Sequence, residues 1–248
     1  MTELTVRAVA GLPEIGEGER LGALIAARAE LVEGDVIVVS QKVVSKAEGR
    51  LRRLSSVIPS AEARRLAAVL GKEPNLVELI LQESRTVVRA ERSVLIVETR
   101  HGFVCANAGI DSSNLPEEGL VCLLPEDPDG SARRLREEIS AAAGAIVGVV
   151  VADSFGRAWR LGQVEVAIGC AGLTPLDDWR GRTDASGREL EATAIAIADE
   201  AAAAADLVRD KAAGVPAAVV RGLGHHVSAD AGPGAAALRR SAEEDLFR

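Results

Sequence analysis

Apolar positions along the chain follow two periods, one typical of strands and one of helices. Segment 4–8 places an apolar side chain at every second position, and 35–40 is a short β-branched run after a glycine, so we expect strands at both. Residues 20–32 carry apolar side chains at helical spacing and predict a helix.

The next third of the chain predicts two helices and then a group of strands. The helices cover 60–71, with Ser60 as N-cap and Gly71 as the stop, and 73–84. The strands cover 86–90, 93–100, 102–107 and 120–125. The residues between the second and third strands favour a hairpin.

The C-terminal half also predicts both helices and strands. We expect a helix over 127–144, capped by Ser131, and then an almost wholly apolar strand over 145–152 that is buried on both faces. The remaining elements are a strand at 163–173, an alanine-rich helix at 189–213 and a strand at 215–224. Such interleaving predicts one mixed α/β (α+β) unit over residues 1–248, with two intimate lobes.

Composition and charge argue against several classes of protein. Hydrophobic residues make up 48% of the 248, enough for a sizeable core, and the net charge of −8 argues against a nucleic-acid partner. The acidic N-terminus is unlike a signal peptide, and no apolar run is long enough to span a membrane. Cys105, Cys122 and Cys170 lie far apart and predict reduced thiols. We expect a cytoplasmic protein.

The stretch "VVADSFGRAWR" (150–160) is the strongest local sign of chemistry. Asp153 and Ser154 follow a buried strand, where ligand crevices form in α/β sheets, and their oxygens suit a hard divalent cation. Arg157 and Arg160 have forked donors that match phosphate or carboxylate. A polar turn that caps the strand is the alternative.

Two other loops offer related groups. "NAGIDSSN" (107–114) holds Asp111 and Asn114, which with Asp153 raise the prospect of a shared metal site, although such residues are also ordinary turn formers. "SQKVVSKAEGR" (40–50) holds Lys42 and Lys46 four residues apart, on one face if the segment is helical. This arrangement is typical of a phosphate contact and, equally, of the solvent-exposed face of a helix.

Loop 177–190 concentrates three arginines, Arg180, Arg182 and Arg188, that suit a polyanionic substrate. The same loop carries three aspartates, so internal ion pairing is an equal alternative. We expect Trp159 to pack beneath this loop.

The sequence has neither a P-loop nor the glycine-rich dinucleotide fingerprint of a Rossmann domain. Its motifs "SKAEGR", "GIDSSN", "DPDGSA" and "DSFGR", in that order, resemble those of the coenzyme F-420:L-glutamate ligase family, the F-420-0 γ-glutamyl ligases. The resemblance runs from about Gly11 to the C-terminus.

The resemblance implies a GDP-forming ligase that adds L-glutamate to the deazaflavin precursor F-420-0 and then adds γ-linked glutamates, through an acyl phosphate. It implies GTP as co-substrate, Mn or Mg, stimulation by potassium, and a homodimer. Some relatives carry a further flavin reductase domain, and we expect the ligase domain alone here. The substrates are small molecules, without nucleic acid or membrane.

The resemblance also assigns roles to residues. It implies metal ligands at Asp111, Asp153 and Ser154 and catalytic roles for Asp111, Asp153 and Lys46. GTP contacts are implied at Leu12, Pro13, Glu14, Ile15, Ser40, Gln41, Lys46 and Asn114. Lys211 stands where an acidic ligand is expected, so it is assigned to phosphate instead. Substrate contacts are expected from Arg157, Arg160, Arg180, Arg182 and Arg188.

Two rival functions use the same loops. A metal-dependent phosphotransferase or phosphohydrolase would consume nucleotide without glutamate. A non-catalytic GTP-binding protein would bind nucleotide without turnover.

Overall fold

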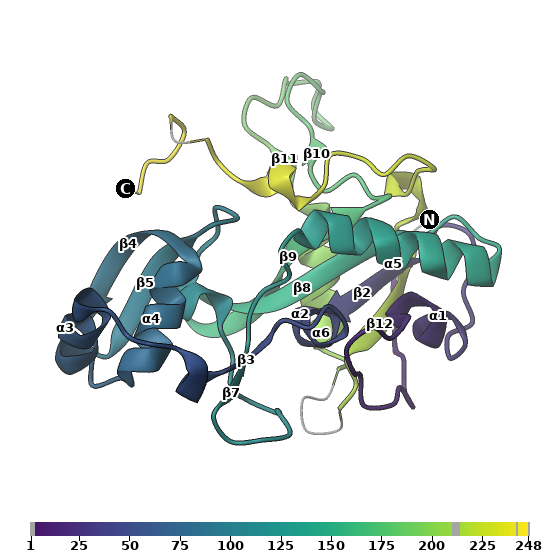
Figure 1. Cartoon of the computed structure of the whole chain (residues 1–248). Helices are drawn as coiled ribbons and strands as arrows, with labels where there is room; N and C mark the ends of the chain where they lie inside the picture. Colours follow the sequence, from purple (N-terminus) through teal and green to yellow (C-terminus); the bar gives the residue numbers. More distant parts are fainter. Residues whose placement is uncertain (1–2, 210–213, 242, 248) are drawn as a thin grey trace.

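A five-stranded sheet lies at the centre of the structure, a computed structural model that describes residues 3–209, 214–241 and 243–247 (Figure 1). In spatial order its strands are β1 (Thr5–Ala8), β12 (Ala217–Arg221), β2 (Val36–Ser40), β8 (Gly148–Arg157) and β9 (Arg160–Ala171). β2 and β8 run parallel, and the other neighbouring pairs are antiparallel. The apolar runs of β2 and β8 are buried because helices cover both faces, as the sequence predicts.

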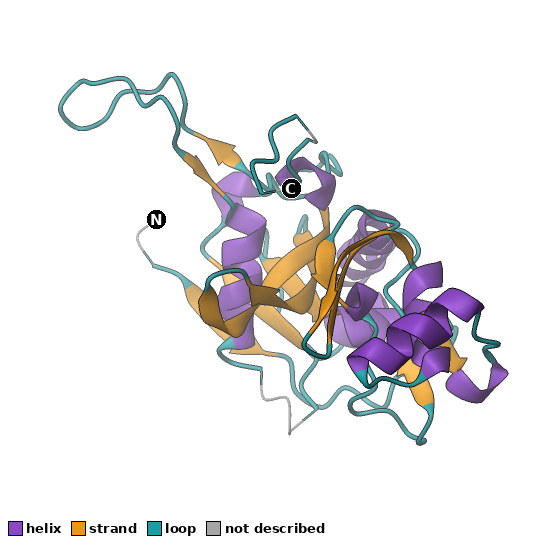
Figure 2. Ribbon diagram, turned by 90° about the vertical axis from the view of Figure 1, so that its left-hand side faces the viewer, coloured by secondary structure: helices purple, strands orange, loops and turns teal. Residues whose placement is uncertain are grey.

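Helices cover the two faces of this sheet with separate apolar cores (Figures 1 and 2). α1 (Leu21–Ala26) and α5 (Pro128–Ala143) pack on one face against the side chains of Val149 and Val151. α6 (Ile197–Asp206) packs on the other face, where its alanines lie against Val38 and Val150. The small alanine side chains allow α6 to lie close to the sheet.

A second, smaller part holds α3 (Ala61–Leu70), α4 (Pro74–Gln82) and a three-stranded sheet (Figure 1). The strands of this sheet are β4 (Ser84–Glu91), β5 (Val94–Thr99) and β6 (Val104–Ala106). The predicted caps are confirmed, since the Ser60 side chain accepts the N–H of Ala63 and Gly71 is left-handed. The mixed α+β fold and its two parts agree with the prediction.

The remaining elements connect the two parts or border the sheets. β3 (Leu51–Arg53) pairs antiparallel with β7 (Leu120–Cys122), and α2 (Gln41–Ala47) follows β2 directly. The part of the chain that the structure describes also contains four short 3-10 helices, at Leu54–Ser56, Asn107–Gly109, Gly224–His226 and Ala235–Leu238. β10 (Asp177–Asp178) and β11 (Ala194–Ile195) form the base of a loop that projects from the molecule (Figure 2).

Within the described residues, no helix is both long and apolar enough to cross a membrane. The three cysteines are free and buried, in agreement with the expected thiols.

The predicted range of the 127–144 helix agrees with α5, but the predicted N-cap is wrong. Asp127, and not Ser131, is the N-cap: its side chain accepts the N–H of Gly130 at 2.9 Å. Pro128 follows at the first helical position, where its missing N–H costs nothing and its fixed φ favours the helix. The helix therefore begins four residues earlier than a serine cap at Ser131 would place it.

Two predicted helices are too long. The segment 20–32 is helical only over α1. At its far end the N–H of Val32 donates to the Asp35 carboxylate at 2.9 Å, in a turn before β2, and is therefore not available for a helical bond. The segment 189–213 is helical only over α6 within the described residues. Ahead of α6, Ala194–Ile195 form β11, since strand pairing with β10 takes their backbone groups.

The strand predicted to end at Ala152 continues to Arg157. β9 supplies partners along this extension, and Asp153 lies opposite Val166 while Ser154 lies opposite Glu165. The polar residues are thus part of a long hairpin, and not a turn after a strand. Tertiary pairing outweighs the local polarity that suggested a strand end.

We predict that Gly169→Ala destabilises the fold by about 2 to 3 kcal/mol. A Cβ on Gly169 would lie 2.1 Å from the carbonyl oxygen of Pro128, at the N-terminus of α5, and backbone cannot move aside cheaply. Gly16→Ala is the control, because a Cβ there meets no atom within 4 Å. Urea unfolding measures both, and equal midpoints for the two variants would contradict the prediction.

Candidate functional site

The carboxyl ends of β2 and β8 meet at one edge of the central sheet. Ser40, the last residue of β2, lies opposite Ala152, so Asp153 begins the part of β8 that extends beyond its parallel neighbour. A cleft of about 730 Å³ opens at this position. Strand ends of this kind are where open α/β sheets bind ligands.

Most of the predicted site residues come together in this cleft, although they lie on four separate segments. Those that line it are Pro13, Glu14, Ile15, Ser40, Gln41, Lys46, Asp111, Asn114, Asp153 and Ser154. Leu12 packs against the main core instead. Lys211 lies outside the described residues.

Asp111 is held by a network of short hydrogen bonds. The backbone of its own loop contributes, since the N–H of Ser113 donates to Oδ1 at 2.7 Å. Lys42 forms an ion pair with Oδ2 at 2.7 Å. Burial opposes ionisation of Asp111, but the bonds from Lys42 and Ser113 outweigh it and hold its pKa below the ordinary value. Asp111 is therefore a carboxylate with a fixed orientation.

Asp153 has the opposite electrostatic environment. Burial raises its pKa to about 7; a hydrogen bond from the backbone of Ser154 opposes the rise, and the negative charges of Glu165 and Asp111 add to it. The fold thus disfavours the charged form of Asp153, mainly because the carboxyl group is buried, and a bound cation would favour that form.

Ser154 belongs to a buried network that the sequence did not reveal. Its hydroxyl donates to Glu165 Oε1 at 2.9 Å, and Glu165 is paired in turn with Arg209. Arg209 also donates to the carbonyl oxygen of Pro216 at 3.3 Å. Glu165 and Arg209 both line the cleft and are less than a tenth exposed. The alternation of residues 163–166 puts Glu165 in the polar phase with Gln163, so the sequence pattern gave no sign that Glu165 is buried.

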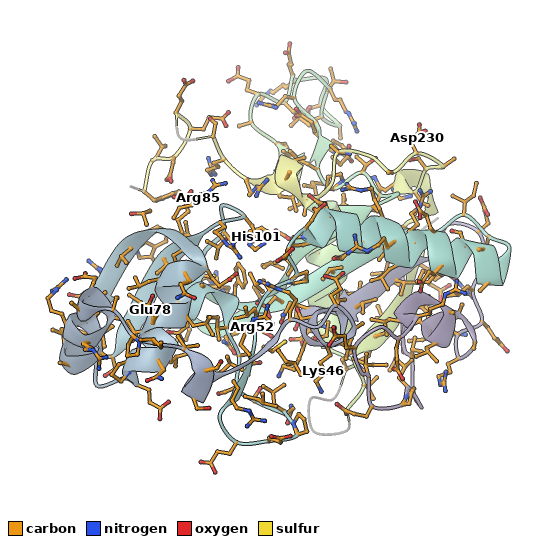
Figure 3. All side chains as sticks on the ribbon, viewed as in Figure 1. Lys46, Arg52, Glu78, Arg85, His101 and Asp230 are labelled. Carbon is orange, nitrogen blue, oxygen red and sulfur yellow. The ribbon has the colours of Figure 1, made fainter. Side chains whose placement is uncertain are left out.

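Lys46 (labelled in Figure 3) lies on α2, one helical turn after Lys42, and both reach the cleft as their spacing predicts. The Lys46 side chain is only 8% exposed, yet it meets the mostly exposed Glu14 at 2.5 Å. Gln41 differs, because its amide donates inward to Ser45 and to the Leu123 carbonyl. A nucleotide contact from Gln41 would therefore use its backbone.

The five arginines expected to hold substrate do not line the cleft. Arg180 pairs with Asp178 at 2.5 Å and Arg182 with Asp177 at 2.8 Å, which is the internal ion pairing considered as the alternative. Arg157 donates to a backbone carbonyl at the tip of its own hairpin. Arg160 and Arg188 also lie outside the residues that form the cleft.

Trp159 does not pack beneath the arginine loop, so that expectation is wrong. It lies at the tip of the β8–β9 hairpin with φ 61° and is 83% exposed. Its ring contacts Phe247, with 5.2 Å between centroids. A two-residue hairpin turn places this side chain outward, which a linear pattern does not show.

Asp111 and Asp153 are the residues of the cleft that could hold a divalent cation. The described residues contain no group of three or more His, Cys, Asp or Glu suited to hold a metal by themselves. Mg²⁺-like cations in phosphate-transfer sites commonly take only one or two carboxylates and complete their shell with water and phosphate oxygens. Asp111 and Asp153 match that pattern, and Lys42 and Lys46 add positive charge for an anion.

Comparisons with known proteins agree with one another. A family model described as F420-0:Gamma-glutamyl ligase matches residues 11–222. The chain is 45% identical to the coenzyme F420:L-glutamate ligase of Methanothermobacter thermautotrophicus, over 97% of both chains. It is 47% identical to the proteins of the same name from Methanopyrus kandleri (95% of this chain, 94% of the relative) and Archaeoglobus fulgidus (97% and 94%).

We predict that Asp153→Asn stabilises the protein in the presence of a metal chelator, and more strongly at pH 8 than at pH 5. The folded pKa of about 7 lies above the ordinary 3.8, so the folded protein loses stability as the pH rises from about 4 to about 7. Asparagine removes that loss. We expect a gain of roughly 3 to 6 °C in Tm at pH 8.

Thermal unfolding of wild type and variant at both pH values provides the measurement. A variant less stable than wild type at pH 8, or a gain that does not shrink at pH 5, would contradict the environment described for Asp153.

Proposed function

Because the chain belongs to the F420-0:gamma-glutamyl ligase family, we propose that its cleft uses GTP and a divalent cation to join L-glutamate to the carboxylate of the precursor F420-0. Family membership makes the chain a ligase of coenzyme F420 formation. The nucleotide, the cation and the chemical path are our proposal. Stimulation by potassium, a homodimer and a cytoplasmic location stay predictions.

One observation supports the proposal most strongly: Asp111, Asp153 and Lys46 line the same cleft although they come from three separate segments. Two acids and a cationic group in one cleft, at the edge of the sheet where β2 ends, suit the transfer of a phosphoryl group. Glu14 and Asn114 border Lys46 in the same cleft, in agreement with the nucleotide contacts expected there.

The first step activates the carboxylate of the precursor. A carboxylate oxygen attacks the γ-phosphorus of GTP, the bond between that phosphorus and the β-bridging oxygen breaks, and GDP leaves with an acyl phosphate formed. Lys46 balances negative charge on the transferred group. Asp111 and Asp153 would hold the divalent cation, which when bound neutralises phosphate oxygens.

The second step forms the amide. The amine nitrogen of L-glutamate attacks the acyl carbon, inorganic phosphate leaves, and the nitrogen gives up a proton. Further rounds at the γ-carboxylate of the added glutamate would extend the chain by γ-linkages. The cleft, at about 730 Å³, falls within the volume typical of small-molecule sites.

The rival functions differ in what they release. A phosphohydrolase or phosphotransferase on this site would form GDP in the absence of L-glutamate and precursor. A non-catalytic GTP-binding protein would form none under any condition. We expect continued release of GDP over many turnovers, with Mn²⁺, only when precursor and glutamate are both present, together with a product heavier by one glutamyl unit.

We predict that Asp111→Asn lowers kcat/KM for glutamate incorporation by about 100-fold, because it removes one of two carboxylates that would bind the cation. Glu117→Gln is the matched control: it removes an acid from the same loop, but Glu117 is exposed and pairs with Arg53 outside the cleft. Mass spectrometry of the glutamylated product measures both. Full activity in Asp111→Asn would sink the assignment of Asp111 to the metal.

A further inference from the structure

The ammonium group of Lys42 lies among three oxygen atoms of the Asp111 loop. Nζ is 2.7 Å from Asp111 Oδ2, 2.7 Å from the carbonyl oxygen of Ser113 and 2.8 Å from Ser113 Oγ. We propose that Lys42 is an exchangeable counter-ion, which holds the Asp111 loop until a divalent cation binds and then turns to the phosphate groups of the nucleotide. This inference rests on the proposed function.

The oxygen atoms around Nζ are of the kind that a hard cation takes. A carboxylate, a backbone carbonyl and a hydroxyl are typical oxygen donors for Mg²⁺ and Ca²⁺. Lys42 and a divalent ion at Asp111 would repel each other at such close range, because both are positive. The two therefore compete for Asp111, and binding of the ion releases Lys42.

Lys42 is placed so that its ammonium group can contact either Asp111 or the phosphate groups of a nucleotide. It is the second residue of α2, which begins where β2 ends, and its side chain is 17% exposed at the cleft. The side chain is a point charge on a flexible four-carbon stem, so its head group can move without the backbone. The adjacent lysine on the same helix face, Lys46, lies in the region that would hold phosphate.

The two lysines of α2 are thus not equivalent. Lys46 pairs with Glu14 at 2.5 Å and has no contact with Asp111 among the described interactions. Lys42 pairs with Asp111 itself. The pair offers an internal control, because either substitution removes one positive charge from the same cleft but only one frees Asp111.

An exchange of this kind couples the two ligands. The cation releases Lys42, and a released ammonium improves the site for an anionic nucleotide, so each ligand should raise the affinity for the other. Removing Lys42 should strengthen the binding of the cation alone and weaken this coupling. A purely structural lysine would not produce that combination.

The test measures Mn²⁺ binding to the full chain from the electron paramagnetic resonance signal of the free ion, with and without GDP. In wild type we expect GDP to lower the Kd of Mn²⁺ about tenfold. In Lys42→Met we expect a Kd for Mn²⁺ alone about tenfold lower than wild type and an effect of GDP below about threefold. Lys46→Met should change the Kd for Mn²⁺ alone by about threefold or less.

Several outcomes would overturn the inference. The first is a Lys42→Met variant that binds Mn²⁺ no more tightly than wild type. The second is a Lys46→Met variant whose affinity for Mn²⁺ rises as much as that of Lys42→Met. The third is an effect of GDP on Mn²⁺ binding that is as large in Lys42→Met as in wild type. Thermal unfolding confirms that each variant is folded, and Lys42→Gln replaces Lys42→Met if that variant is not. Wild type that binds no Mn²⁺ would refute the proposed metal site and this inference together, whereas normal wild-type binding with no effect of Lys42 refutes the inference alone.

Discussion

The parallel pairing of β2 with β8 is the constraint on which the rest of the site depends. It brings Ser40 opposite Ala152 and so makes both strands reach the same edge of the sheet. α2 then carries its lysines along that edge, and β8 continues past it with Asp153. The two strands are buried on both faces, so the apolar cores beneath them fix the separation of groups that have no direct contact with each other.

The two carboxyl groups at this edge, Asp111 and Asp153, have pKa values shifted in opposite directions. Asp111 is held ionised by its contacts, whereas burial and neighbouring acids hold the pKa of Asp153 near 7. Burying the charged form of Asp153 costs free energy of folding, and the large apolar cores on both sides of the sheet offset that cost. In the proposed function, a cation bound by Asp111 and Asp153 would favour the charged form of Asp153, and the proposed release of Lys42 would add a positive charge for the phosphate groups.

The sequence was sufficient where local patterns decide the structure and insufficient where distant partners do. Ser60 and Gly71 delimit α3 as predicted because a cap and a left-handed glycine act within one turn. Asp153 and Ser154 were predicted as site residues and do line the cleft, yet the continuation of their strand depends on β9. Glu165 and Arg209 lie 44 positions apart, and nothing in the chain between them indicates that they form an ion pair. The projecting tip at Trp159 likewise follows from hairpin geometry and not from composition.

The most direct test of the account is a crystal structure of the protein with GDP and Mn²⁺, in which anomalous scattering locates the ion. The account predicts an anomalous peak within coordinating distance, about 2.2 Å, of carboxylate oxygens of both Asp111 and Asp153, with the diphosphate in the same cleft beside Lys46. A peak bound by neither aspartate, or a nucleotide outside the cleft at the ends of β2 and β8, would contradict it.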